Sequence, residues 1–224
     1  NKLRNNHTLV HTLDITKAYD SVIPDILEAQ LTKLNFPQTY IKIIKGLTVD
    51  REIKLHPKFG LNHTRQSSLG LAQGSSLSPI LFTIYIREIN NLPLNRSQII
   101  TYADDMAIIT KLTINEYLNI PQDIQDEINT IQDELRNIGL EINPTKCNSI
   151  IFKNGRTTYE TTVKFNNIPI ISKPSIKFLG LQLDHKLSWK TQAQKIYNKI
   201  SSIIPLFKCV SNKNGDFILN TSIY

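Results

Sequence analysis

Apolar residues repeat at helical spacing most clearly between residues 121 and 138. Five of them recur at steps of four, three, four and three: Ile124, Ile128, Ile131, Leu135 and Ile138. This spacing places the side chains on one face of a helix. Gly139 follows at once, and glycine is common just after the last residue of a helix. The pattern predicts an amphipathic helix over 121–138.

Four other segments show a helical repeat, and proline stands near the start of three of them, at Pro24, Pro37 and Pro79. Proline is tolerated in the first turn of a helix. The predicted helices cover residues 24–34, 37–47, 76–90 and 188 to about 205. In the second helix we expect these residues to face inward: Tyr40, Ile41, Ile44 and Leu47. In the last helix an apolar face is expected to pack inward through Ile196, Ile200 and Ile203.

Strands are predicted between these helices. Residues 9–15 form an apolar run that reads as a buried strand, and residues 99–110 are apolar on both sides of an Asp-Asp pair, which indicates a hairpin. Further short strands are expected in these ranges: two within 51–69, then 150–153, 163–165, 168–171 and 177–183. Asn166-Asn167 is a plausible hairpin turn. The order of strands and helices predicts an α+β layered domain.

Charge is distributed unevenly along the 224 residues, which carry a net charge of +7. Residues 1–160 hold 17 basic and 17 acidic residues, whereas residues 161–224 hold nine lysines and two acids. The basic end is expected either to face a polyanion or to be an ordinary solvated surface.

The number of cysteines and the length of the apolar runs indicate the compartment of the protein and whether it contacts a membrane. Cys147 and Cys209 are the only cysteines, which favours reduced thiols in an intracellular protein, of the nucleus or the cytoplasm. No apolar run approaches the roughly 20 residues that a membrane span needs, so we expect no membrane partner.

Three carboxylates are placed where they need a partner. Asp14 ends the first predicted strand, and Asp104 and Asp105 lie at the bend of the hairpin. Carboxylates near a core are costly unless cations neutralise them. Two Mg²⁺ ions at roughly 3.5–4 Å from each other satisfy such a group and support phosphoryl transfer. Taken singly, an Asp-Asp pair in a hairpin is more often a solvated turn, and an Asp at a strand end is usually a helix or turn cap.

Five segments, in the same order, resemble the catalytic motifs of reverse transcriptases. They are LDITKAYDSV (13–22), QGSSLSP (73–79), YADD (102–105), GLEINPTK (139–146) and FLGL (178–181). The sequences of these motifs are most similar to those of non-LTR retrotransposons, particularly jockey-like elements. The resemblance implies a right-hand polymerase palm, an antiparallel sheet backed by helices, over residues 1–184. Residues 185–224 would begin a helical thumb, and the fingers would be missing because the chain is expected to be a piece of a longer protein.

The resemblance also implies roles for individual residues. Asp14, Asp104 and Asp105 match the ligands of two Mg²⁺ ions, for which Mn²⁺ can substitute. Tyr19 matches the bulky residue that excludes a 2′-hydroxyl, although a core aromatic is the alternative. Lys146 matches the acid that protonates pyrophosphate, with an ordinary surface lysine as the less favoured alternative.

The remaining implied contacts are with substrates. Ile15, Ala18 and Tyr102 would lie beside the incoming nucleotide, and Gln73 and Gly74 beside the nascent base pair; the alternative for this loop is a turn with Ser76 as helix cap. The primer grip and the thumb would contact nucleic acid through Phe178, Leu179, Gly180, Lys186, Lys190, Lys195 and Lys199.

These roles predict an RNA-directed DNA polymerase that uses an RNA template, a DNA primer and deoxynucleotides, with residues 1–224 alone a poor enzyme. One alternative is an RNA-dependent RNA polymerase of the same fold, which usually has Gly before the Asp pair and no bulky aromatic at position 19. Another is a domesticated remnant that only binds nucleic acid.

Overall fold

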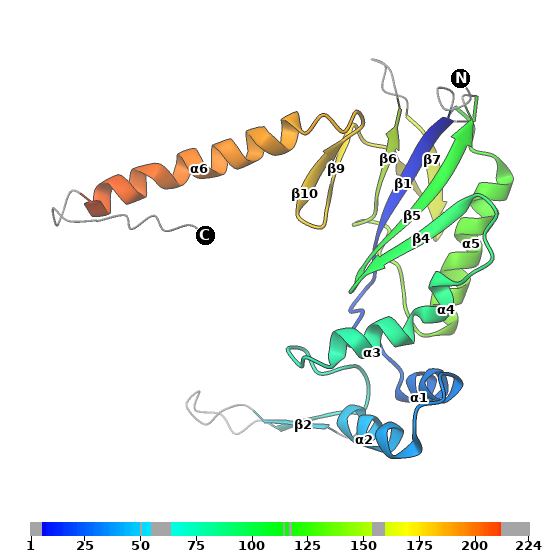
Figure 1. Ribbon diagram of the computed structural model, residues 1–224. Helices are drawn as coiled ribbons and strands as arrows, with labels where there is room; N and C mark the ends of the chain where they lie inside the picture. The colour runs from blue at the N-terminus through cyan, green and yellow to red at the C-terminus, as the bar shows by residue number, and fades with distance from the viewer. Residues whose placement is uncertain are drawn as a thin grey trace.

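A four-stranded antiparallel sheet forms the centre of the molecule, in the order β4–β5–β1–β6 (Figure 1). Its strands are β1 (Asn6–Asp14), β4 (Ser97–Tyr102), β5 (Asp105–Thr113) and β6 (Asn148–Phe152). The computed structural model describes residues 6–49, 51–54, 64–113, 115–116, 118–153 and 160–211. The sheet confirms the strand predicted over 9–15 and the hairpin around Asp104-Asp105.

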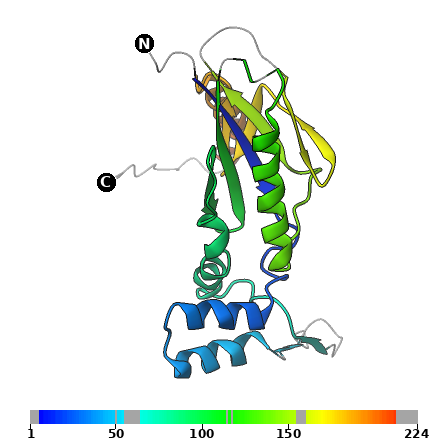
Figure 2. The same ribbon diagram turned by 90° about the vertical axis from the view of Figure 1, so that its right-hand side faces the viewer.

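Helix α5 (Gln122–Asn137) covers one face of this sheet (Figure 2). Side chains alternate along β1, so Leu9 and Leu13 point toward α5 while Val10 points to the other face. The predicted inward residues of α5 are fully buried from Ile124 to Leu135, and Gly139 adopts a positive φ of 75° just beyond the helix. The amphipathic pattern of 121–138 is therefore confirmed.

Two hairpins flank the sheet. One consists of β7 (Thr162–Phe165) and β8 (Ile168–Ile171), and Asn166 and Asn167 turn it with φ of 50° and 62°, as a two-residue hairpin turn requires. The other consists of β9 (Ser175–Phe178) and β10 (Leu181–Asp184). The single strand predicted over 177–183 is wrong, because Leu179 and Gly180 both adopt positive φ and reverse the chain.

The segment between β1 and β4 forms a second, mostly helical layer. It contains α1 (Pro24–Lys33), α2 (Gln38–Thr48), the hairpin of β2 (Arg51–Lys54) and β3 (Thr64–Ser67), and then α3 (Ser78–Tyr85) and α4 (Arg87–Asn90). The residues predicted to join β2 to β3, around His56-Pro57 and Gly60, lie outside the described residues. The single helix predicted over 76–90 is interrupted at Ile86, whose ψ is 6°.

Helix α2 packs on one side only. Ile41 and Ile44 are buried, as predicted, but Tyr40 is 59% exposed and Leu47 is 54% exposed. The prediction that all four face inward is wrong. Helix α2 packs against α1 on one side only, and its apolar residues cover more of the helix surface than this contact buries.

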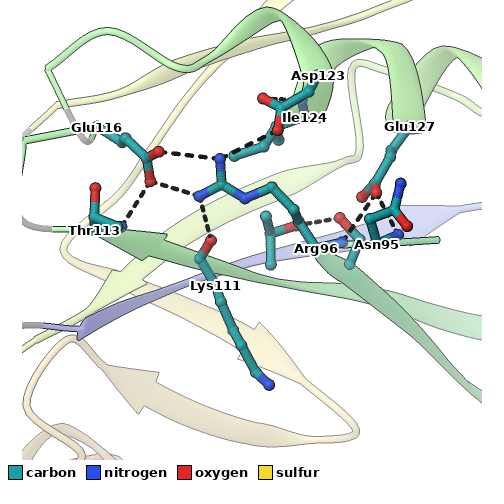
Figure 3. Close-up of polar contacts among 10 residues, drawn as sticks. Asn95, Arg96, Lys111, Thr113, Glu116, Asp123, Ile124 and Glu127 are labelled. Atoms are coloured by element: carbon teal, nitrogen blue, oxygen red, sulfur yellow. Dashed lines mark hydrogen bonds and ion pairs between the residues drawn. The ribbon is translucent and has the colours of Figure 1, made fainter. Parts of the chain in front are cut away.

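Arg96 ties the far end of the β4–β5 hairpin to the start of α5 (Figure 3). Its guanidinium contacts the Glu116 carboxylate at 2.5 Å and the Asp123 carboxylate at 3.3 Å. Hydrogen bonds from the Arg96 guanidinium lower the pKa of Glu116 to about 2. Glu127 accepts the backbone N–H groups of Asn95 and Arg96. The hairpin is thus anchored at the end opposite its Asp-Asp turn.

His7 and His11 both lie in β1. The His11 ring is completely buried with its edge toward Phe165, at 5.5 Å between centroids. Neither ring nitrogen of His11 has a hydrogen-bond partner among the described residues. Burial lowers the pKa of His11 to about 3, so it is neutral at physiological pH.

Helix α6 (Lys190–Ser211) projects away from the sheet and has β10 as its main neighbour (Figure 1). It continues through Pro205, beyond the predicted end. Ile196, Ile200 and Ile203 are 48%, 53% and 37% exposed, so the prediction that they pack inward is wrong.

The joint before α6 is a tight turn. The buried Asp184 carboxylate accepts hydrogen bonds from the backbone N–H groups of Lys186 and Ser188, and Leu187 and Trp189 have positive φ.

No helix in the described residues is long and apolar enough to cross a membrane.

Candidate active site

The three predicted metal ligands lie at one end of the central sheet. Asp14 ends β1 and pairs directly with Asp105, the first residue of β5. Asp105 also pairs with Tyr102, the last residue of β4, so Asp104 lies in a two-residue turn with Ala103, whose φ is 53°. Strand pairing alone therefore brings the first and third motifs together.

These carboxylates repel one another. Loss of hydration, and then the negative charges of Asp104 and Asp14, raise the pKa of Asp105. Burial raises the pKa of the neighbouring Cys147 thiol to about 11, so this thiol is protonated at physiological pH. The hard oxygen ligands of the site are those that Mg²⁺ prefers.

The carboxylates do not form a ready-made metal site in this arrangement. Among the described residues, no three Asp, Glu, His or Cys side chains are close enough together to hold one ion. The expectation that all three converge within one coordination sphere is therefore not met. Asp104 and Asp105 are exposed to solvent, so water hydrates both carboxylates.

The fourth motif lies against the first. Ile142 forms a β-bridge with Ile15, and the Asn143 N–H donates to the Asp14 carbonyl at 2.8 Å. This pairing brings Lys146 to the carboxylates, with its Nζ 3.5 Å from Asp14 Oδ2. Lys146 thus lies beside the carboxylates with its side chain 65% exposed, and its role stays a prediction.

A cavity of about 260 Å³ lies between the sheet end and the β9–β10 hairpin. The predicted site residues that line it are Asp14, Asp105, Lys146, Phe178, Leu179 and Gly180. The first, third, fourth and fifth motifs therefore meet around one space, although they are spread over more than 160 residues of sequence.

The same cavity is lined by three residues that the sequence analysis missed: Thr12, Asn148 and Lys177. Strand alternation alone identifies Thr12, because it lies two residues before Asp14 on the same face of β1. Asn148 donates a hydrogen bond to the Lys146 carbonyl and accepts one from Lys173 Nζ. No local sequence pattern predicts these contacts.

Tyr19 lies beside the carboxylates and is half-buried. Its ring stacks on Phe82 of α3 at 4.9 Å between centroids. Partial burial and the negative charge of Asp104 raise the pKa of Tyr19. This position suits either a packing residue or a gate, so its role stays a prediction, as do those of Ile15 and Ala18, which are buried, and of Tyr102, which is exposed.

A second, larger cleft of about 1000 Å³ opens between the loop of the first motif, the β2–β3 hairpin and the loop of the second motif. Gln73 lines this cleft and donates from Nε2 to both Asp20 carboxylate oxygens, at 3.1 Å and 3.3 Å. Gly74 adopts a φ of 84° that favours glycine, with open space where a Cβ would lie. Ser76 is not the helix cap, because Leu77 occupies the N-cap position.

The four predicted thumb lysines are solvent-exposed: Lys186, Lys190, Lys195 and Lys199. None of them lines the cavity with Asp14, so any contact with nucleic acid would be made away from the carboxylates.

A comparison with protein-family models now identifies the family. The model described as "Reverse transcriptase (RNA-dependent DNA polymerase)" matches residues 1–183. The chain belongs to the reverse transcriptase family. Divalent metal ions are generally used in this family, which agrees with the oxygen-rich donor set of this reverse transcriptase.

Two similar relatives are both described as "RNA-directed DNA polymerase from mobile element jockey". The Drosophila melanogaster protein is 28% identical over 190 residues, which cover 82% of this chain and 20% of the relative. The Drosophila funebris protein is 27% identical over 185 residues, which cover 80% and 20%. The jockey-like resemblance is confirmed, and the chain spans about a fifth of the length of these relatives.

Solved structures confirm the fold. Telomerase from Candida tropicalis, in complex with a fragment of telomeric RNA, superposes with a TM-score of 0.55 at 16% identity, over 84% of this chain and 31% of that one. Telomerase from Candida albicans, also with a telomeric RNA fragment, gives 0.52 at 15% identity, over 79% and 29%. The mixed α+β architecture with its antiparallel sheet is that of a polymerase palm.

Proposed function

We propose that this reverse transcriptase chain is the catalytic palm of an RNA-directed DNA polymerase that adds deoxynucleotides to a primer on an RNA template. Residues 1–184 would form the palm and residues 185–224 the start of the thumb. The observation that carries the proposal is the shared cavity, in which Asp14 and Asp105 face Lys146 and the primer-grip residues Phe178–Gly180.

The reaction that fits this cavity is nucleotidyl transfer. The primer 3′-hydroxyl loses its proton to water and its oxygen bonds to the α-phosphorus. The bond from the α-phosphorus to the oxygen that bridges to the β-phosphate breaks, and pyrophosphate leaves. Asp14, Asp104 and Asp105 would hold two Mg²⁺ ions, or Mn²⁺ in their place. When bound, such ions activate the hydroxyl and stabilise the leaving oxygen. Their positive charge would also relieve the repulsion that raises the pKa of Asp105.

Lys146 would act on the leaving group. Its ammonium lies 3.5 Å from the Asp14 carboxylate, and the side chain is 65% exposed, so it is free to turn toward a bound triphosphate. From there it would neutralise charge on the departing pyrophosphate and donate a proton to it.

Tyr19 would select the sugar. Its ring stacks on Phe82, and the Asp104 charge helps to raise its pKa, so the ring lies close to Asp104. A nucleotide bound at the carboxylates would therefore place its sugar against the ring. In the parent polymerase, by which we mean the longer protein expected to contain this chain, Tyr19→Val should raise ribonucleotide incorporation relative to deoxynucleotide by roughly tenfold or more. Competition between the two nucleotides in primer extension measures this, and unchanged discrimination would return Tyr19 to a packing role.

The central experiment removes one carboxylate charge. In the parent polymerase, Asp104→Asn should reduce primer extension by about a thousandfold, because loss of a metal ligand removes several kcal/mol of transition-state stabilisation. Binding to a primer–template duplex should remain largely intact, because Asp104 repels phosphate. The matched control is Asp126→Asn, an exposed carboxylate on α5 that is bonded to Gln122 and remote from the cavity.

Two outcomes would contradict the proposal. Normal extension by Asp104→Asn would remove the carboxylates from the chemistry. A wild-type parent that binds duplex but never extends a primer would instead favour the nucleic-acid-binding remnant.

A further inference from the structure

We propose that Asn148 is a positioning residue. Held by Lys173, it fixes the turn that carries Lys146, so that Lys146 stays aligned with the leaving group of the incoming nucleotide. The identity of that leaving group rests on the proposed function. The orientation of Asn148 rests only on its contacts with Lys146 and Lys173.

The two contacts of Asn148 fix which end of its side-chain amide faces which neighbour. Its Oδ1 lies 2.7 Å from Lys173 Nζ, and its Nδ2 lies 3.0 Å from the Lys146 carbonyl oxygen. An ammonium only donates hydrogen bonds and a carbonyl only accepts them, so a flipped amide would lose both bonds. The bond from Lys173 is also charge-assisted, which makes it the stronger kind. Asn148 is therefore held in one orientation.

The turn of residues 143–148 is anchored at both ends. At its start, the Asn143 N–H donates to the Asp14 carbonyl at 2.8 Å, and the Asn143 carbonyl accepts from the Lys146 N–H at 3.1 Å. At its end, Asn148 holds the Lys146 carbonyl. The main chain of Lys146 is thus fixed through both its N–H and its carbonyl, while its ammonium lies 3.5 Å from Asp14 Oδ2.

Lys173 is in turn held by the backbone of β6. Its N–H donates to the Ser149 carbonyl at 2.7 Å, and Ser172 forms a β-bridge with Ser149. Lys173 lies two residues before β9, which runs beside β6 (Figure 1). The bond from Lys173 to Asn148 therefore joins the turn that carries Lys146 to the β9–β10 hairpin.

Asn148 lies where a small movement of this turn would affect the chemistry. It lines the cavity of about 260 Å³ together with Asp14 and Lys146. Its own strand position is set by pairing with Thr12 of β1. A displacement of reacting groups by about 1 Å can cost roughly a hundredfold in rate. Loss of the Asn148 side chain should therefore slow the reaction by releasing Lys146, with the central sheet still paired.

The first test measures the single-turnover rate of nucleotide addition by the parent polymerase. Asn148→Ala should reduce this rate about fivefold, the loss expected for one ordinary hydrogen bond. Lys173→Met should cause a similar loss, whereas Lys173→Arg should keep most of the rate because a guanidinium still donates to Asn148. In a Lys146→Ala background, neither Asn148→Ala nor Lys173→Met should add a further loss.

The dependence of this rate on the leaving group separates positioning from a general structural defect. A nucleotide whose β- and γ-phosphates are bridged by CH₂ has a more basic leaving group than one bridged by CF₂. The more basic group needs more stabilisation as it departs. The losses in Asn148→Ala and Lys173→Met should therefore be larger with the CH₂ analogue. A structural defect would lower both rates by the same factor, and that result would overturn the inference.

The matched control is Lys164→Met, which removes an exposed lysine of β7 that does not line the cavity and should leave the rate unchanged. Lys173 is also exposed, so Lys173→Met keeps the test decisive if Asn148→Ala fails to fold. Wild-type rates in Lys173→Met would overturn the inference. So would losses that simply add to that of Lys146→Ala, since a positioning residue acts only through its partner.

The second test does not depend on polymerase activity. In residues 1–224, the backbone amide NMR signal of Lys146 should shift in Lys173→Met, stay near its wild-type position in Lys173→Arg and stay unchanged in Lys164→Met. An unmoved signal in Lys173→Met would refute the positioning role. If Lys146→Ala leaves the dependence on the leaving group unchanged, the proposed role of Lys146 fails, and the NMR result then decides the role of Asn148 by itself.

Discussion

Helices α5 and α6 have the same kind of amphipathic sequence and opposite surroundings. The inward residues of α5 are completely buried against the sheet, whereas Ile196, Ile200 and Ile203 of α6 are between 37% and 53% exposed. A helical repeat states which face of a helix is apolar. Whether that face is buried depends on a neighbour, which α5 has in the sheet, whereas the main neighbour of α6 among the described residues is the short strand β10.

The comparison predicts very different responses to the same truncation. Ile131→Ala on α5 should reduce the free energy of unfolding by about 2–5 kcal/mol, because it leaves a cavity in a closed core. Ile200→Ala on α6 should change it by less than about 0.5 kcal/mol, because the side chain is already hydrated. Chemical denaturation of residues 1–224 measures both. A large loss from Ile200→Ala would mean that α6 is buried in solution.

Acid should destabilise the folded chain through His11, which is completely buried in β1. The folded state holds the pKa of His11 at about 3, below the ordinary value of 6.5, so the unfolded chain binds the proton first as the pH falls. Above pH 6.5, His11 is neutral in both states and does not change the free energy of unfolding. Below that pH, the free energy of unfolding decreases by about 1.4 kcal/mol per pH unit. At pH 5 the loss should be roughly 2 kcal/mol.

His11→Leu isolates this effect, because leucine has no charge to gain and no ring nitrogen to leave unpaired. Its free energy of unfolding should depend less on pH between 7 and 5, as measured by urea titration at each pH. Burial and the charge of Lys153 also lower the pKa of His7, so some acid sensitivity should remain in the variant. An identical pH profile for wild type and His11→Leu would show that His11 is hydrated in solution.

The smallest expected effect concerns the charged side of α6. Changing Lys186, Lys190, Lys195 and Lys199 to Gln should weaken duplex binding by the parent polymerase without altering stability. The slope of log affinity against log salt should fall by roughly 0.7–0.9 for each phosphate that a lysine no longer neutralises. Lys42→Gln on α2 serves as the control. An unchanged slope in the fourfold variant would make this lysine face an ordinary solvated surface.

The sequence predicted what depends on local pattern and strand pairing. The strand ending at Asp14 and the buried face of α5 follow from the apolar pattern, and the hairpin follows from the acidic break at Asp104-Asp105. The resemblance assigned roles to Lys146 and Phe178, and both line the cavity with Asp14. It failed where a neighbour or a turn decides the structure. Leu179 looks like part of a continuous apolar strand, yet its positive φ makes the turn between β9 and β10.

Contacts between polar side chains far apart in the chain could not be predicted from the sequence either. The bond from Gln73 to Asp20 spans 53 residues and depends on how the loops pair at Gly70. Asn148 reaches the cavity because β6 pairs with β1, and Lys173 holds it there from another loop. No spacing within one motif encodes such contacts, because each needs the tertiary arrangement first.

The turn before α6 also provides a spectroscopic label. Trp189 is the only tryptophan in the chain, it lies at the first turn of α6 and its ring is 51% exposed. Indole emission depends on the polarity around the ring, so selective excitation of tryptophan observes this joint and no other part of the fold. Titrating a primer–template duplex and following the emission wavelength would therefore report movement or desolvation where α6 meets β10, without attaching a dye.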